Sequence, residues 1–207
     1  MTTARSLLAV VVLALAAVAG RPASANPGAE ASKFVENMAN VAIRTVADKQ
    51  ISDQLRTERF RQLFVGSFDI PEIARFVLSR HWRSASTQQR ERFVSLFEDM
   101  TVLTWAKRFK EYGGETLKVV AVQPENDDWL VISEIVRPQQ AGQPVHVRWR
   151  LRQETAGWRV VDIIVEDVSM ALTQRQDFAA VLQGNGGSVD ALLDTLQNKV
   201  EQLRKGG

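Results

Sequence analysis

Residues 145–152, which read VHVRWRLR, alternate without exception between apolar and basic side chains. A period of two places successive residues on opposite faces of a β-strand, so one face is apolar and the other carries His146 and three arginines. Residues 155–157 then lead into a second apolar run, residues 158–165, at the spacing of a three-residue hairpin loop. The chain is therefore expected to build an antiparallel sheet with two chemically unlike faces.

The hairpin also predicts which residues lie opposite one another. A turn that places Glu154 opposite Trp158 keeps apolar residues together across the two strands. The predicted apolar pairs are Leu151–Val161, Trp149–Ile163 and Val147–Val165, and Val131 and Ile135 of the preceding strand continue this face. The same register predicts two polar pairs on the other face, Arg150–Asp162 and His146–Glu166, each worth about 0.2–1 kcal/mol.

Helical periodicity dominates the chain on both sides of this sheet. Residues 29–112 are expected to form helices that begin after Ser52, Asp69 and Ser86, with Gln89 completing a capping box at Ser86. Strands are expected over 116–123, 128–137, 144–152 and 158–167, and further helices over 169–183 and 188–204. Because the loops between strands are too short for parallel crossovers, the predicted class is α+β. It has N-terminal helices, a four-stranded antiparallel meander, and C-terminal helices that wrap one face around an apolar pocket.

The first 25 residues are predicted to be a cleaved signal peptide. Arg5 provides a positive start, residues 6–19 form an apolar run, and Ala-Ser-Ala at 23–25 suits a cleavage site. A membrane anchor is the alternative interpretation, but the run is short for a spanning helix. With cleavage the mature chain begins at Asn26, and residues 26–207 are expected to form a single domain in an exported protein.

Composition narrows the function classes. Without the signal peptide, the chain has 24 basic and 24 acidic residues, since only Arg5 and Arg21 are charged before residue 26. Global charge therefore gives no support for a nucleic-acid partner. The sequence has no cysteine, which excludes disulfide bonds and a thiol nucleophile.

The acidic residues at the end of the sheet allow two interpretations. Asp162 and Glu166 are cross-strand partners of cations, or one of them acts with a histidine in a cone-shaped α+β hydrolase or isomerase. The enzyme alternative requires an acid to point into the pocket beside His81 or His146. Ser169 is expected to cap the helix that follows. No GxSxG, phosphate-loop, HExxH or ligand-spaced histidine pattern is present, so no catalytic residue, cofactor or metal site is predicted.

Three stretches together resemble one family of proteins. They are residues 74–100 (ARFVLSRHWRSASTQQRERFVSLFEDM), 158–178 (WRVVDIIVEDVSMALTQRQDF) and 186–203 (GGSVDALLDTLQNKVEQL). They are similar to the MlaC family, also called the toluene-tolerance family of periplasmic auxiliary proteins, and the similarity spans residues 31–203. The matching residues are Ala74, Leu78, Trp82, Gln89, Phe93, Phe97, Tyr112, Trp158, Asp162, Val168, Ser169, Arg175 and Phe178.

The sequence departs from the family pattern at a few positions. The family often has glycine where Ser79 and Asp167 stand, and tyrosine where Gln174 stands. Residues 173–178, TQRQDF, are closer to the hopanoid-associated branch, HpnM, than to the phospholipid branch. These departures leave open whether the ligand is a phospholipid or a hopanoid-type lipid.

The resemblance implies a binding protein in the periplasm rather than an enzyme. Members of the family are expected to pass lipid between an inner-membrane ABC transporter complex and an outer-membrane lipoprotein complex. Their fold implies a twisted sheet wrapped by helices, with acyl chains inserted between them.

The side chains expected to bind lipid combine the apolar face of the sheet with neighbouring helices. They are Leu96, Met100, Leu103, Val131, Ile135, Val147, Trp149, Leu151, Val161, Ile163, Val165 and Met170. A lipid cavity and a dry core use the same residue types, so a protein-binding adaptor without a cavity is a further alternative. A cavity bordered by Trp149, with Arg148 and Arg150 facing away from it, would favour the carrier.

Overall fold

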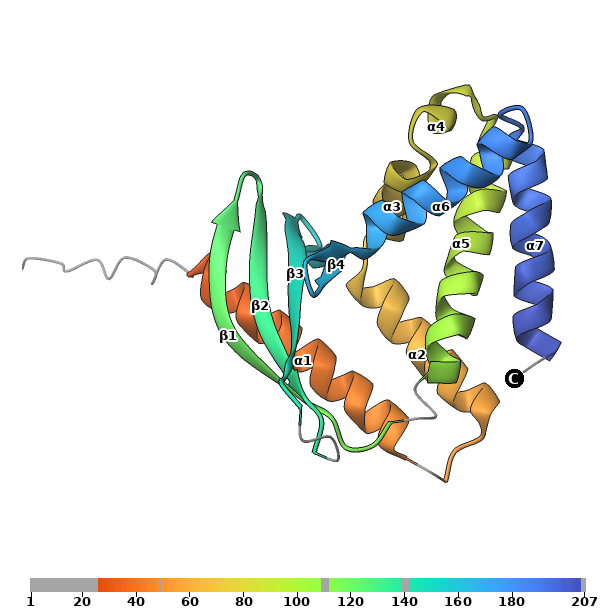
Figure 1. The fold of residues 1–207 in the computed structure, drawn as a ribbon. Coiled ribbons are helices and arrows are strands. Elements are labelled where there is room, and N and C mark those ends of the chain that lie inside the picture. Colours follow the sequence, from red (N-terminus) through yellow and green to blue (C-terminus); the bar gives the residue numbers. More distant parts are fainter. Residues whose placement is uncertain (1–25, 49, 109–111, 139–141, 206–207) are drawn as a thin grey trace, which may run out of the picture.

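An antiparallel sheet stands beside a layer of helices, and the first helix packs along the sheet (Figure 1). The computed structural model describes residues 26–48, 50–108, 112–138 and 142–205, so the predicted signal peptide, residues 1–25, lies outside the described residues. The helices are α1 (Pro27–Ala47), α2 (Asp53–Ser67), α3 (Ile70–Leu78), α4 (Arg80–Ser84), α5 (Thr87–Arg108), α6 (Met170–Gly184) and α7 (Val189–Lys205). The strands are β1 (Thr116–Glu125), β2 (Asp128–Val136), β3 (Val145–Glu154), β4 (Gly157–Val165) and β5 (Val168–Ser169).

The strands form a meander in which each one pairs with the next along the chain. This confirms the predicted α+β class and the antiparallel connections, but the described sheet has five strands rather than four. The additional strand, β5, pairs with the end of β4 through Val165–Val168 and Ile164–Ser169. Two residues are too few to display a period of two, so the sequence pattern gave no sign of this strand.

The predicted register of β3 and β4 is correct over half of the hairpin and wrong by one residue over the other half. The correct pairs are Val147–Val165, Trp149–Ile163 and Arg150–Asp162. A β-bulge beyond Arg150 then places Leu151 opposite Val160 instead of Val161, and Trp158 opposite Gln153. The bulge adds one residue to β4, so Val160 and Trp158 share the face of Leu151.

A two-residue turn, Glu166 and Asp167, ends β4 earlier than predicted. Both residues have positive φ, 46° and 67°, as a type I′ hairpin turn requires. Two contacts hold the turn: the His146 amide donates to Glu166 Oε1 at 2.6 Å, and Arg148 pairs with Asp167 at 2.6 Å. Glu166 thus lies beside His146 as predicted, but it contacts the backbone rather than the imidazole. Asp167 has a left-handed backbone conformation, at a position where the family that the sequence resembles often has glycine.

The predicted helix starts are confirmed by their capping hydrogen bonds. The side chains of Ser52, Asp69 and Ser169 each accept a backbone N–H from the first turn of the following helix. At α5, Ser86 Oγ accepts from the Gln89 amide at 3.1 Å, while Gln89 Oε1 accepts from the Ser86 amide at 2.9 Å. These reciprocal bonds form the predicted capping box.

Two helix ends differ from the sequence pattern, in which Gly66 is expected to end the second helix and residues 69–82 to belong to the third. The second helix continues through Gly66 to Ser67. The third ends at Leu78, because Ser79 adopts φ 56° and ψ −132°, and a separate short helix begins at Arg80. Such backbone angles are unfavourable for a residue with a β-carbon, at a cost of about 1–3 kcal/mol.

Ser79→Gly is expected to raise the free energy of unfolding by about 1 kcal/mol, because glycine adopts positive φ without steric strain. Urea denaturation, read as a shift in midpoint at constant slope, measures the change. The matched control is Ser95→Gly on the exposed side of α5, where glycine should destabilise the helix by about 0.5 kcal/mol. Equal destabilisation by both substitutions would contradict the strain at Ser79.

Two separate hydrophobic clusters stabilise the layers. In the helical layer, Phe93 is fully buried, and its ring lies 6.2 Å from that of Phe97 and 5.6 Å from that of Phe178. In the sheet layer, α1 packs on the strands through a cluster of buried side chains: Ala31, Val35, Met38, Val131, Leu151, Trp158 and Val160.

The junction between α2 and α3 joins these two clusters. Leu63 and Phe68 are partly buried against both of them. The Asp69 amide donates to the Val160 carbonyl at 3.0 Å, and Phe68 forms a parallel bridge with the same residue. The β-bulge of β4 is thus one place where the helical layer is attached to the sheet.

Candidate functional site

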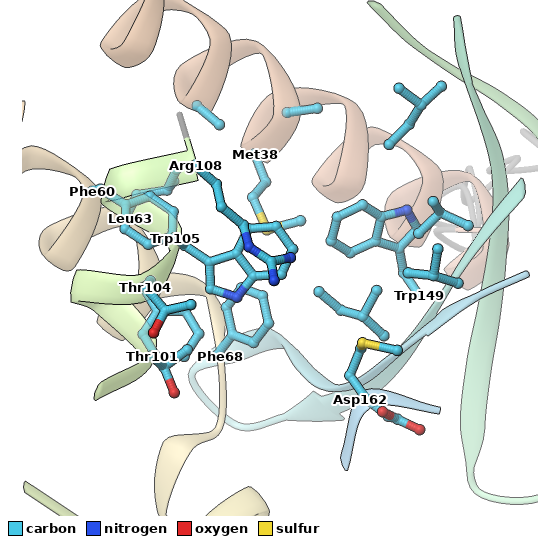
Figure 2. A pocket seen from close by; sticks show the side chains of 18 of the residues that line it. Met38, Phe60, Leu63, Phe68, Thr101, Thr104, Trp105, Arg108, Trp149 and Asp162 are labelled. Carbon is cyan, nitrogen blue, oxygen red and sulfur yellow. The ribbon is translucent and has the colours of Figure 1, made fainter. Parts of the chain in front are cut away.

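A cavity of about 500 Å³ lies between the two hydrophobic clusters. Its wall combines the inner face of the sheet with residues of α1, α2, α5 and α6, and most of these side chains are apolar. Figure 2 shows Trp105 and Arg108 of α5 on one side of the cavity and Trp149 of β3 on the other. Pockets of about 300–1,000 Å³ with apolar walls are typical of sites for small organic ligands.

The structure brings eight of the twelve predicted side chains to this wall. They are Met100, Ile135, Val147, Trp149, Val161, Ile163, Val165 and Met170. The other four lie elsewhere: Val131 and Leu151 are fully buried in the sheet cluster, Leu96 is buried in the helical cluster, and Leu103 packs against that cluster. Contact of the eight wall residues with lipid remains a prediction.

Trp149, on the inner face of β3, forms part of the cavity wall. Trp149 borders the cavity, and its indole N–H donates to Ser133 Oγ at 2.9 Å. Ser133 is fully buried and donates in turn to the Val147 carbonyl at 3.1 Å. The polar atom of the indole is therefore satisfied inside the sheet, which leaves the apolar ring to face the cavity.

The basic side chains of β3 lie on the opposite face and are paired there. Arg148 contacts Asp167 at 2.6 Å, Arg150 contacts Glu125 at 2.8 Å, and Arg152 contacts Asp128 at 2.9 Å. Neither Arg148 nor Arg150 borders the cavity. The predicted division of β3 into an apolar inner face and a basic outer face is confirmed, whereas the outer face of the sheet as a whole also carries the buried side chains of Leu130 and Ile164.

Asp162 acts as a structural anchor for α6. Its side chain is only 5% exposed and accepts hydrogen bonds from Ser169 Oγ at 2.7 Å and from the Ala171 amide at 3.0 Å. Its predicted partner, Arg150, is more distant at 3.6 Å. The carboxylate thus binds the N-terminus of α6, where a negative charge is favourable.

The enzyme alternative lacks the arrangement that it requires. Asp162 does border the cavity, contrary to the predicted outward orientation, but neither His81 nor His146 is among the described residues of the wall. The Asp162 carboxylate instead accepts hydrogen bonds from the start of α6. Across the described parts of the chain, no three potential ligand side chains gather in a way that could hold a metal ion. In those same parts, no helix has the length and apolarity needed to span a membrane.

Several wall residues were missed by the sequence reasoning. Met38, Ala42 and Ile43 of α1 belong to the wall because α1 packs on the sheet. Their helical spacing was visible in the sequence, but it does not specify which layer the helix contacts. Trp105 and Arg108 lie outside the main apolar stripe of α5. A tryptophan at such a position was the available sign that a second surface of this helix is covered.

The fold and the cavity together define an α+β protein with a large apolar internal site between a curled sheet and a helical layer. The chain belongs to the MlaC family, since the family model described as MlaC protein matches residues 36–198. The family membership predicted from the sequence is thereby confirmed.

Two individual proteins illustrate the similarity. The intermembrane phospholipid transport system binding protein MlaC of Haemophilus influenzae is 22% identical over 129 residues, which cover 61% of this chain and 59% of that protein. The match thus spans less than two thirds of the length of this curated relative. A solved structure of the phospholipid-binding protein from Ralstonia solanacearum, in complex with a phospholipid, aligns with a TM-score of 0.75 and 22% identity. It covers 84% of this chain and 99% of that one, and it has the same fold.

Proposed function

We propose that this chain is a periplasmic carrier that binds a phospholipid or hopanoid-type lipid in the cavity between sheet and helices. The observation that carries the proposal is the apolar cavity of about 500 Å³, bordered by eight of the side chains that the sequence predicts to contact lipid. The phospholipid named for the Ralstonia solanacearum protein supports a cargo of this class.

The size of the cavity supports an internal cargo on energetic grounds. The wall is mostly apolar, so water in a volume of about 500 Å³ would find few hydrogen-bond partners there. A ligand that fills this space with methylene groups would recover about 0.8 kcal/mol for each group buried.

The transport role rests on the family and on the predicted signal peptide. We propose that residues 1–25 direct export and are removed, and that residues 26–207 form the carrier domain. The carrier would receive or deliver lipid at an inner-membrane ABC transporter complex and exchange it with an outer-membrane lipoprotein complex. The name of the Haemophilus influenzae relative, an intermembrane phospholipid transport system binding protein, supports this role. The function requires binding and release and no catalytic residue.

The direct test is the composition of protein purified without detergent from the cells that make it. Native mass spectrometry is expected to show the chain with about one additional lipid mass, and solvent extraction followed by lipid analysis should identify that lipid. A hopanoid in the extract would favour the HpnM branch, and a glycerophospholipid would favour the phospholipid branch. A chain without lipid under these conditions would contradict the carrier and favour the protein-binding adaptor.

A further inference from the structure

The wall of the cavity changes from apolar to cationic along α5. The cavity-facing residues of this helix are Phe97, Met100, Thr101, Thr104, Trp105 and Arg108. Their spacing follows one face of a helix, so they form a continuous stripe along the cavity. Phe97 is buried in the helical cluster at one end of the stripe, and Arg108 is exposed at the other. An elongated ligand therefore meets hydrocarbon at one end and a positive charge at the other.

The guanidinium of Arg108 lies over an aromatic ring, and no described residue forms a hydrogen bond with its edge. It lies 5.1 Å from the centre of the Trp105 ring, and both side chains border the cavity (Figure 2). Stacking uses the flat face of a guanidinium, whereas its N–H donors point outward from the edge. No carboxylate among the described residues forms an ion pair with Arg108. This arrangement suits bidentate contact with a phosphate.

The other charged side chains of the described wall do not compete for that role. The Asp162 carboxylate is bound to the start of α6, and Glu115 accepts a hydrogen bond from the Gly113 amide at 2.8 Å. The N-terminus of α6 is also occupied, because its Ala171 and Leu172 amides donate to Asp162 and Ser169. Among the described residues of the wall, Arg108 is the one cationic side chain that could receive an anion.

The length of the stripe matches the depth of a lipid tail. Phe97 and Arg108 are separated by eleven residues, which corresponds to about 16 Å along an α-helix. One leaflet contributes about half of the roughly 30 Å hydrocarbon core of a bilayer, or about 15 Å. A lipid whose chain end lies beside Phe97 would thus place its headgroup close to Arg108.

We propose that Arg108, stacked on Trp105, binds the phosphate of the cargo headgroup and selects lipids that carry an anionic phosphate. The inference rests on the proposed lipid-carrier function and deepens it, because it assigns the headgroup end of the site. It also sets the orientation of the cargo, with the chains toward Phe97 and the phosphate at the end of α5.

A competition between two lipids with identical chains tests this assignment. Delipidated protein is offered equimolar dioleoyl phosphatidic acid and dioleoylglycerol in mixed micelles, and the bound lipids are quantified by mass spectrometry after detergent removal. The wild-type chain is expected to prefer phosphatidic acid by tenfold or more. Arg108→Gln should reduce that preference to near unity while retaining dioleoylglycerol, and Arg108→Lys should give an intermediate ratio.

The controls separate this inference from its alternatives. Arg59→Gln removes the same charge from an exposed position of α2 outside the cavity wall and should leave the ratio unchanged. A wild-type ratio in Arg108→Gln would overturn the inference while leaving the carrier intact, whereas no capture of either lipid by any variant would overturn the proposed function. Glycerol 3-phosphate alone should not displace bound lipid at millimolar concentration. Displacement that depends on Arg108 would assign the site to free phosphate esters instead.

Discussion

Ile163→Asp is expected to lower lipid occupancy by at least about 100-fold. Ile163 lies on the inner face of β4 opposite Trp149, and both side chains border the cavity. A carboxylate at this position is hydrated while the cavity is empty, but it would lose its water beneath an acyl chain. Burial of an unpaired charge costs several kcal/mol, which exceeds the 2.7 kcal/mol that corresponds to 100-fold. Lipid bound per protein, measured by mass spectrometry after detergent-free purification, reads the effect directly.

A matched substitution on the other face of the same sheet provides the control. Ile132 lies opposite Arg148 on the ionic face and is half-buried like Ile163. Ile132→Asp introduces the same charge into the sheet without touching the cavity, so lipid occupancy should remain at the wild-type level. Undiminished lipid in Ile163→Asp, or equal loss in both variants, would contradict a cargo lying against the inner face.

Asp162→Ala is expected to lower the free energy of unfolding by about 2–4 kcal/mol. The substitution removes the acceptor for Ser169 Oγ and for the Ala171 amide at a site that is almost fully buried. Hydrogen bonds to a charged group contribute about 1.5–3 kcal/mol, and loss of a capping side chain costs about 1 kcal/mol. Urea denaturation monitored by tryptophan fluorescence measures the change.

Asp167 supplies the comparison for Asp162. Its side chain is 90% exposed and pairs with Arg148 at 2.6 Å, so the contact is close but exposed to water. Asp167→Asn removes the charge while keeping a residue that tolerates positive φ, and the expected loss is below 1 kcal/mol. A change of less than about 0.5 kcal/mol in Asp162→Ala would mean that the start of α6 does not depend on this carboxylate.

The faces of the sheet and the helix starts could be predicted because the sequence contains a strong local signal for each. The alternation in residues 145–152 places Trp149 and Arg150 on opposite faces, and a wrong choice would bury a row of arginines. The capping residues Ser52, Asp69, Ser86 and Ser169 act within four residues of their partners. Signals of this kind need no knowledge of the tertiary structure.

The bulge in β4 could not be predicted because the sequence does not distinguish the register with the bulge from the register without it. Val160 and Val161 are adjacent and identical, so a shift of one residue exchanges one valine for another beside Leu151. The neighbouring Trp158 and Ile163 are apolar on either register. The bulge coincides instead with a tertiary contact, since the Val160 carbonyl accepts the hydrogen bond from the Asp69 amide of the helical layer.

The division between cavity wall and dry core was equally inaccessible from the sequence. Leu96, Met100 and Leu103 occupy one apolar side of α5, yet Met100 borders the cavity while Leu96 is buried in the helical cluster. The choice depends on how far α5 is rotated about its axis relative to α1 and the sheet. Arg108 was missed because a cation is not expected on an otherwise apolar wall.

The separation of the two hydrophobic clusters has a consequence for unloading. Each layer contains its own buried side chains, and both described attachments lie along β4: the Val160 carbonyl accepts from the Asp69 amide, and Asp162 binds the start of α6. A bound lipid would thus lie between the two layers and contact both of them. Its departure would remove contacts from both layers while leaving the interior of each layer packed. The layers could then approach one another by rotation about their attachments along β4 without unfolding any helix.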